Sequence, residues 1–306
     1  MLLGIEIGGT KLQFGVGPGD GTLVGDVLRL NVDRAAGAAG IREQVEAAGR
    51  ELIARHGVTA VGIGFGGPVD VEQGRTITSH QIAGWDDFPL VDWCRQTLAV
   101  PCSIGNDADL AALAEARYGA GRGLDPVFYV TVGTGIGGGF VQAGRLYHGY
   151  GPAAAEIGHL RPGPTSLSPY DTVESIASGL GIERAAERLR DDDIFAGLEV
   201  PTLTARELAW AAARGHVASH RVLDHAITTL GWALAQMITL LAPQAVVVGG
   251  GVALVGEEQF YVPLRAAVAR YVFPPLAGSY RILAPALGET MVVHGALAIA
   301  APVTEI

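Results

Sequence analysis

The sequence contains few cysteines. Only two of its 306 residues are cysteine, Cys94 and Cys102, and neither belongs to a C-x-x-C pair or to a cysteine–histidine cluster. Disulfide frameworks and structural zinc sites need more cysteines at closer spacing, so we expect neither. This cysteine usage is typical of a protein of the reducing cytoplasm.

Basic residues are also scarce. Lysine and arginine together number 21 against 31 acidic residues, which gives a net charge of −10. Binding of nucleic acid or of an anionic membrane usually relies on dense blocks of basic residues, and the sequence has none. We therefore expect a small-molecule partner, with no nucleic acid and no membrane surface.

Long apolar segments of the secretory or membrane kind are missing as well. Glu6 and Lys11 interrupt the first apolar run, which argues against a signal peptide. The uncharged stretch 226–256 has the length of a membrane span, but Pro243 breaks it. We predict instead a helix that ends near Ala242, followed by a strand.

Glycine is abundant, with 44 residues that cluster after apolar runs. Leu2–Ile7 is predicted to be a strand that enters the turn Gly8-Gly9-Thr10, and Val127–Val132 a strand that enters Gly133-Thr134-Gly135. A returning strand follows each turn, whereas a dinucleotide-binding G-x-G-x-x-G turn opens a helix. We therefore predict two equivalent hairpins from a duplication, the first continuing into a third strand, Leu23–Leu30.

The two glycine turns are candidate phosphate sites. Glycine reaches left-handed backbone conformations without steric penalty, so successive N–H groups of such a turn can converge on an anion. Two hairpins that face each other across a cleft between two lobes would hold a polyphosphate from both sides. A tight turn with a purely structural role is the alternative interpretation.

Asp107 follows a predicted strand, Val100–Ile104, and precedes a predicted helix, 108–118. Phosphoryl transfer to a hydroxyl needs a base that accepts the hydroxyl proton, and Asp107 is our candidate. Asn106 or Asp107 also suits the N-cap of this helix, and the two roles are compatible.

Glu156, His159 and Glu174 lie in and after a loop rich in proline and glycine. They can accept hydrogen bonds from sugar hydroxyls, or they can ligate a metal as an E-x-x-H pair, which needs a continuous helix. Gly158 argues against such a helix, so we favour hydroxyl recognition. Glu6 is either a metal ligand through water or a half-buried glutamate on an edge strand.

Together these motifs resemble the ROK family of sugar kinases and repressors, a branch of the actin-like ATPase and sugar kinase superfamily. The resemblance covers nearly the whole chain and rests on the segments Ile5–Lys11, Gly62–Asp70, Asn106–Ala108, Gly133–Gly139, Glu156–His159, Glu174–Gly179 and Val248–Gly251.

The resemblance implies an α/β chain of two ribonuclease-H-like lobes with mixed sheets and an interlobe cleft. The N-terminal lobe would comprise residues 1–117 and 290–306, and the C-terminal lobe residues 118–289. It further implies a cytoplasmic, glucokinase-like enzyme, expected to be a homodimer, that phosphorylates a hexose with ATP and magnesium.

The resemblance also assigns site residues. Asp107 would be the catalytic base, and Glu6 would hold magnesium through water. The hexose would be bound by Gly67, Asn106, Asp107, Glu156, His159 and Glu174. The nucleotide would be bound by Gly8, Gly9, Thr10, Lys11, Gly133, Thr134, Gly135, Gly249, Gly250 and Gly251.

The chain departs from the family pattern at several positions. Many members carry a cysteine-rich zinc loop after the histidine of the Glu-x-Gly-His motif, whereas Leu160–Val173 has no cysteine. His159 is thus expected to face the sugar without zinc. Gln81 stands in place of a frequent asparagine, Gly66 in place of a frequent proline, and Glu6 in place of aspartate, so acceptor choice and activity are expected to be affected.

Two alternatives stay open. A non-catalytic sugar-binding regulator of the same family is opposed by the absence of a basic recognition helix and by the start of the first phosphate strand at Leu2. A polyphosphate-dependent glucokinase is compatible with the paired glycine turns.

Overall fold

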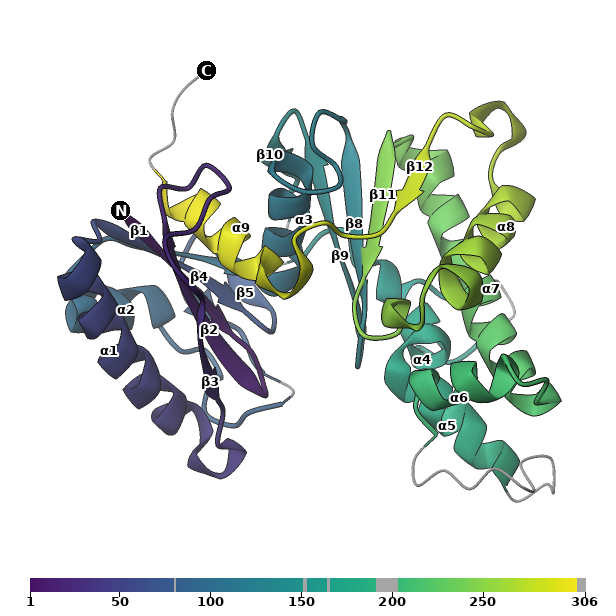
Figure 1. Cartoon of the computed structure of the whole chain (residues 1–306), viewed down its shortest axis with the longest axis horizontal. Helices are drawn as coiled ribbons and strands as arrows, with labels where there is room; N and C mark the ends of the chain where they lie inside the picture. Colours follow the sequence, from purple (N-terminus) through teal and green to yellow (C-terminus); the bar gives the residue numbers. More distant parts are fainter. Residues whose placement is uncertain (80, 151–152, 164–165, 191–202, 302–306) are drawn as a thin grey trace. The chain divides into compact units, whose positions relative to one another are not determined.

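The computed structural model describes residues 1–79, 81–150, 153–163, 166–190 and 203–301. The chain divides into two compact units (Figure 1). Unit 1 consists of Met1–Gly123, Gly139–Ala154 and Ala286–Ile306, and unit 2 of Leu124–Gly138 and Ala155–Pro285. The expected lobes, 1–117 with 290–306 and 118–289, stay a prediction; their residues 302–306 lie outside the described part of the chain.

A five-stranded sheet in the order β3-β2-β1-β4-β7 forms the centre of unit 1. Its strands are β1 (Leu2–Ile7), β2 (Lys11–Gly17), β3 (Leu28–Asn31), β4 (Ala60–Phe65) and β7 (Cys102–Asn106). Strands β1, β4 and β7 are parallel, with Ile7 opposite Phe65 and Phe65 opposite Asn106. All three therefore end at the same edge of the sheet.

Helices cover both faces of this sheet (Figure 1), as its nearly continuous buried apolar strands require. They are α1 (Gly37–His56) and α2 (Leu90–Leu98) on one face, and α3 (Asp107–Arg117) and α9 (Met291–Ala300) on the other. Helix α1 buries Ile41 and Val45, as their spacing predicts, and ends at Gly57 with φ of 62°.

Helix α9 lies very close to the strands. A Cβ atom on Gly4 would lie 2.5 Å from the carbonyl oxygen of Val293, and one on Gly62 would overlap the carbonyl oxygen of Ala296. Only glycine fits at these two strand positions.

The third predicted strand is wrong in its extent. It was expected over Leu23–Leu30, but β3 begins only at Leu28. Gly25 adopts a φ of 73° and breaks the extended backbone, while the N–H of Val24 donates to the carbonyl of Val16 outside the ladder.

The sheet β10-β9-β8-β11-β12 repeats the strand order of the first. Its strands are β8 (Val127–Val132), β9 (Ile136–Gln142), β10 (Arg145–Leu146), β11 (Ala245–Gly249) and β12 (Arg281–Leu283). Strands β8, β11 and β12 are parallel. Because the β1–β2 and β8–β9 hairpins take the same place in the two orders, their predicted equivalence is confirmed.

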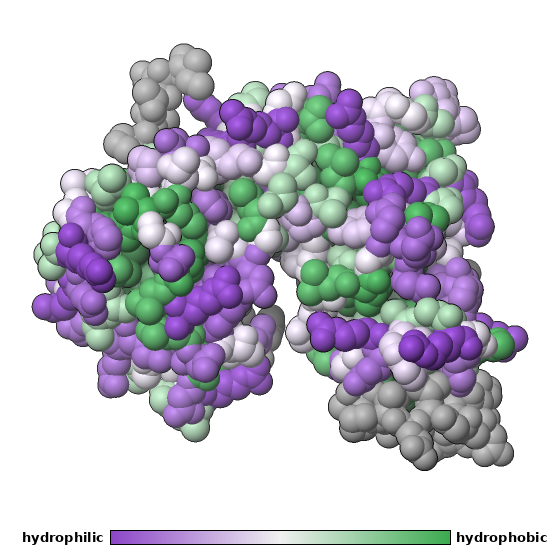
Figure 2. Space-filling model, viewed as in Figure 1, coloured by the Kyte–Doolittle hydropathy of each residue, from purple (hydrophilic) through white to green (hydrophobic). Residues whose placement is uncertain are grey.

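Unit 2 carries five helices among the described residues, with α7 and α8 side by side (Figure 1). They are α4 (Val173–Ala177), α5 (Gly179–Arg190), α6 (Ala205–Ala212), α7 (Val217–Leu241) and α8 (Val262–Tyr271). Thr204 and Glu207 form a capping box at the start of α6. Hydrophilic and hydrophobic residues are interspersed on the face of the molecule shown in Figure 2.

Shorter elements complete the chain. They are β5 (Val69–Asp70), β6 (Arg75–Thr76), the 3-10 turns η1 (Arg34–Ala36), η2 (Ile157–His159), η3 (Ala253–Val255), η5 (Pro274–Leu276) and η6 (Gly288–Thr290), and the π-helical turn η4 (Glu257–Tyr261). Within the described ranges, no helix combines the length and apolar character that crossing a membrane demands.

One buried carboxylate ties three segments of unit 1 together. Glu115 of α3 is fully buried. Its Oε2 accepts hydrogen bonds from the N–H groups of Ala120 (2.8 Å) and Ala286 (3.1 Å), and its Oε1 accepts one from Leu287 (2.9 Å). A single side chain thereby joins the end of α3, the turn after it and the segment that leads to α9.

Replacing this carboxylate is expected to destabilise unit 1. Glu115→Ala removes the acceptor of three partly buried N–H groups, so the free energy of unfolding should fall by about 2–4 kcal/mol. Urea unfolding followed by circular dichroism measures this change. Glu51→Ala, at an exposed position of α1, is the control and should change stability by less than about 0.5 kcal/mol. Equal stability of the two variants would contradict the role of Glu115.

Candidate nucleotide and sugar sites

The ends of the parallel strands bring three loops of unit 1 together. Gly8, Gly66 and Asp107 directly follow β1, β4 and β7. The N–H of Gly66 donates to the carbonyl of Ile7 (2.9 Å). A Cβ on Gly66 would lie 3.5 Å from Oδ2 of Asp107 and 3.6 Å from Cα of Gly8. In α/β sheets, ligands bind at this carboxyl edge.

Asn106 caps α3 and holds a neighbouring loop. Its Oδ1 accepts hydrogen bonds from the N–H groups of Ala108 (2.9 Å) and Asp109 (3.3 Å). Its Nδ2 donates to the carbonyl of Gly67 (2.9 Å). The predicted N-cap is therefore confirmed and assigned to Asn106, which also fixes the loop predicted to lie beside the sugar.

Asp107 is the first residue of α3. Its Oδ1 accepts a hydrogen bond from the N–H of Ala108 (2.8 Å). The amino end of a helix stabilises a negative charge, so this position suits an ionised carboxylate. Asn106 is the N-cap of α3. Asp107 is the next residue and lies at the carboxyl edge of the sheet.

The first glycine turn leaves two successive N–H groups available. Gly8 closes the hairpin by donating to the carbonyl of Lys11 (3.1 Å). The N–H groups of Gly9 and Thr10 have no acceptor within the described residues. The side chain of Gln81 packs so closely that its Oε1 would overlap a Cβ on Gly9. Gln81, which departs from the family pattern, thus lies directly against this turn.

Glu6 points from the central strand of unit 1 and is only 13% exposed. The interpretation of Glu6 as an edge-strand residue is wrong, because β1 has neighbours on both sides. Oε2 of Glu6 accepts a hydrogen bond from Nε2 of Gln13 (2.7 Å), and Nζ of Lys11 lies 4.0 Å from Oε1.

The electrostatic environment of Glu6 favours its protonated form. Burial raises the pKa of Glu6 to about 7; the charges of Asp107 and Glu289 add to this effect, while Lys11 and Gln13 oppose it. The influence of Asp107 on this pKa indicates that the two carboxylates are close enough for their charges to interact. Such a pair of oxygen donors is the kind that Mg²⁺ prefers, directly or through water.

The second glycine turn is held by α4 and by the first residue of α5. The N–H of Gly179 donates to the carbonyl of Gly133 (2.7 Å), and the N–H of Ile136 donates to Oε2 of Glu174 (2.7 Å). Gly133 donates to the carbonyl of Gly135 (2.9 Å). The N–H groups of Thr134 and Gly135 find no acceptor in the part of the chain that is described.

The expected backbone conformation of this turn is wrong. Neither Gly133 nor Gly135 adopts a positive φ. Gly135 is needed for another reason, since a Cβ there would lie 2.6 Å from Oε2 of Glu174. Its role is to let the carboxylate approach the backbone.

The glycines after β11 lie against the end of β8. The N–H of Val252 donates to the carbonyl of Val132 (2.9 Å). Gly250 has a φ of 93°, and a Cβ on it would lie 2.5 Å from the backbone of Val132. The turn Gly249–Gly251 and the turn after β8 are therefore adjacent at one edge of the sheet.

The predicted sugar-contacting residues of unit 2 lie close together. His159 and Glu174 line one cavity of about 300 Å³, together with Thr134, which is predicted to bind the nucleotide. Nε2 of His159 lies 4.0 Å from Oε2 of Glu156. Burial raises the pKa of Glu156, the charge of Glu174 raises it further, and His159 opposes both.

The segment that carries Glu156 and His159 is a single 3-10 turn, Ile157–His159, with Glu156 at its N-cap. The prediction that no continuous helix forms there is confirmed. Among the described residues, no group of three histidine, cysteine, aspartate or glutamate side chains is arranged to hold a metal ion.

One supporting residue, Gln13, and one supporting contact of Glu174 were not predicted. Gln13 is a fully buried polar residue that binds both Glu6 and, through Nε2, the carbonyl of Glu289 (3.0 Å). Glu174 was predicted to contact sugar, but its bond to the Ile136 backbone was not. A polar residue within the apolar run Lys11–Val16 is the one signal that could have revealed Gln13.

The chain is similar to sugar kinases along nearly its whole length. Residues 2–302 match the family model described as the ROK family. The glucokinase of Halalkalibacterium halodurans is 30% identical over 307 residues, which cover 96% of this chain and 92% of that protein.

Two solved structures have the same mixed α/β fold. The ROK hexokinase from Thermus thermophilus is 30% identical with a TM-score of 0.84, and the match covers 98% of this chain and 97% of that one. A ROK family glucokinase from Streptomyces griseus, solved with glucose and AMPPNP, is 31% identical with a TM-score of 0.80, and 98% of both chains is covered.

The raised pKa of Glu6 predicts a pH dependence of stability. Folded Glu6 holds its proton up to about pH 7, whereas unfolded glutamate loses it near pH 4.5. The folded state binds more protons in this window, so stability falls as pH rises through it. Glu6 should lower the free energy of unfolding by about 3 kcal/mol across this pH window. The Glu6→Gln variant, which has no ionisable group at this position, should not show this decrease.

Urea unfolding in metal-free buffer between about pH 4.5 and 8 tests this expectation. The stability difference between Glu6→Gln and the parent should grow by about 3 kcal/mol across the window. Glu51→Gln, exposed on α1, serves as the control and should follow the parent. If the Glu6→Gln curve runs parallel to the parent curve, Glu6 does not carry the effect.

Proposed function

The chain belongs to the ROK family, and on that premise we propose that it is a glucokinase-like hexose kinase that uses ATP, with Asp107 as general base. The observation that carries this proposal is the position of Asp107 at the carboxyl edge, beside Gly8 and Gly66. A base there is next to the turn whose open N–H groups suit phosphate.

In the proposed reaction, the carboxylate of Asp107 takes the proton of a sugar hydroxyl. The hydroxyl oxygen forms a bond to the γ-phosphorus as the bond between that phosphorus and the bridging oxygen breaks, and ADP leaves. Asn106 positions Asp107 indirectly, because it caps α3 and so fixes the first turn of the helix. Positioning and electrostatic stabilisation supply most of the rate enhancement in such reactions.

The phosphates of ATP are assigned to the two glycine turns. Thr134 and Gly135 in unit 2, and Gly9 and Thr10 in unit 1, each offer two successive N–H groups. Gly8, Lys11 and Gly133 complete these turns, and Gly249–Gly251 would meet the nucleoside. The assignment of Gly249–Gly251 to the nucleoside is supported by the position of this turn beside the turn after β8.

The hexose is assigned to the polar side chains near these turns. Glu156, His159 and Glu174 would accept hydrogen bonds from its hydroxyls, and Gly67 with Asn106 would contribute from unit 1. Oε2 of Glu174 accepts a hydrogen bond from the N–H of Ile136, whereas Oε1 accepts none within the described residues. A single glutamate can thus serve both the turn and the sugar.

Magnesium fits the donor set of unit 1. Glu6 is a largely buried carboxylate with a raised pKa, and the charge of Asp107 acts on it, so a cation there would relieve both effects. We assign Glu6 as its ligand through water. When bound, the ion neutralises phosphate charge.

Two alternative functions differ from the proposed one in catalytic turnover or in the phosphoryl donor. A non-catalytic regulator of the family would bind sugar without turnover. A polyphosphate-dependent kinase would use the same glycine turns with a different donor. The cytoplasmic location, the homodimer and the absence of a nucleic-acid partner stay predictions from the sequence.

The base is tested by Asp107→Asn. This change keeps the side-chain shape but removes the proton acceptor, so kcat should fall about 10²–10⁴-fold while the affinity for sugar stays within about threefold. Enzyme-coupled ADP detection and calorimetric titration of the sugar measure the two quantities.

Asp92→Asn is the matched control, because Asp92 also lies in the first turn of its helix, α2, and is exposed. Its kcat should match that of the parent. Near-normal turnover in Asp107→Asn would rule out the proposed mechanism.

A panel of activity assays tests the phosphoryl donor and the sugar acceptor together. Glucose, mannose, fructose, allose and N-acetylated amino sugars are assayed with ATP and, separately, with polyphosphate. We expect turnover of glucose with ATP. Sugar binding without turnover under every condition would favour the regulator, and turnover with polyphosphate alone would favour the second alternative.

A further inference from the structure

A second pocket of unit 2 lies outside the residues proposed for catalysis. It has a volume of about 810 Å³ and is lined by the loop before α4 and by α4, α5 and α7. The side chains that matter here are Tyr170, Ser175, Arg184, Arg188, Arg221 and His225.

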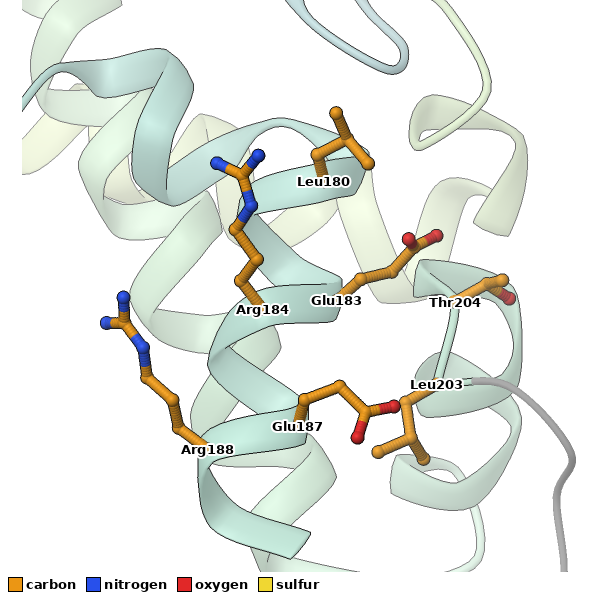
Figure 3. Close-up of a pocket in the computed structure, with 7 residues that line it drawn as sticks. All are labelled: Leu180, Glu183, Arg184, Glu187, Arg188, Leu203 and Thr204. Atoms are coloured by element: carbon orange, nitrogen blue, oxygen red, sulfur yellow. The ribbon is translucent and has the colours of Figure 1, made fainter. Parts of the chain in front are cut away.

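Two helices supply its basic groups in matching pairs. Arg184 and Arg188 are four residues apart on α5, and Arg221 and His225 are four residues apart on α7, so each pair shares one helix face. Figure 3 shows Arg184 and Arg188 extending from the same side of α5.

The opposite side of α5 is acidic. Figure 3 shows Glu183 and Glu187 projecting toward Leu203 and Thr204, where they line, together with Arg184 and Arg188, a different pocket of about 510 Å³. The acidic and basic side chains of α5 thus extend in different directions, although Arg184 and Arg188 line both pockets. The basic face is the one that meets α7 at the 810 Å³ pocket.

The charge in this pocket is unbalanced. Three arginines face one lining carboxylate, Asp171, which gives +3 − 1 = +2 with His225 neutral, in a chain of net charge −10. Within the described residues, Arg184, Arg188 and Arg221 make no ion pair. The three arginine side chains are exposed, and an anion bound between them would interact with all three positive charges.

We infer that this pocket binds an anion that carries phosphoryl groups. Guanidinium forks match the oxygens of phosphate and bind them in pairs, and the hydroxyls of Tyr170 and Ser175 add further donors. A volume of about 810 Å³ accommodates a ligand larger than a single phosphate ion.

The pocket adjoins the candidate sugar cavity. Tyr170, Ser175 and Arg184 line both the 810 Å³ pocket and the 300 Å³ cavity that contains Thr134 and Glu174. An occupant of the basic pocket would therefore lie next to the candidate sugar cavity of unit 2. Two sources provide such an anion: an inorganic polyphosphate chain and a phosphorylated sugar.

Calorimetric titration with tripolyphosphate and with glucose 6-phosphate tests the inference on the full chain. The double variant Arg188→Ala/Arg221→Ala should weaken binding of at least one of these probes tenfold or more. Arg270→Ala/Arg281→Ala, at two exposed positions of unit 2 outside the pocket, should change it less than twofold. Thermal unfolding of both double variants verifies that they are folded.

The outcomes are distinct. Loss of tripolyphosphate binding in the first double variant identifies polyphosphate as the source, and loss of glucose 6-phosphate binding identifies a sugar phosphate. Equal binding by the two double variants, or no binding of either probe to the parent, overturns the inference. The titration requires no turnover, so its result is independent of whether the proposed kinase activity is found.

Discussion

The in-register ending of parallel strands is the constraint on which the candidate site residues of each unit depend. In unit 1, Ile7, Phe65 and Asn106 are opposite one another, and in unit 2 Gly249 is opposite Thr131. Residues that follow these strands are then adjacent although they are far apart in the sequence. Hydrogen bonding between strands therefore decides which loops can act on one ligand, before any side chain contributes.

Most of the glycines at these sheet edges are needed because another part of the chain packs directly against their backbone. Fewer of them are needed for an unusual backbone conformation. Gly9 admits Gln81, Gly135 admits the carboxylate of Glu174, and Gly62 admits the backbone of α9. Gly250 is a position where a positive φ and a close approach coincide. The glycine-rich composition therefore reflects the tight packing of turns, strands and helices.

The sequence predicts the local features of this protein well, because strand, turn and capping signals are short in range. The hairpins at Gly8 and Gly133, the cap before Asp107 and the end of α7 before Pro243 all follow from neighbouring residues. The roles of Glu115 and Gln13 could not be predicted, since their partners Leu287 and Glu289 are distant in the chain. A glutamate on a helix gives no local sign of burial.

Glu6 and Asp107 show how one edge can assign different tasks to two carboxylates. Glu6 lies on a central strand with little solvent, and burial raises its pKa to about 7. Asp107 accepts an N–H at the start of α3, where the helix stabilises negative charge. Groups whose environments differ in this way divide acid–base work between them. A base must be ionised before it can accept a proton, so the helix start suits Asp107 to that task. The buried strand suits Glu6 to a site where a cation compensates its charge.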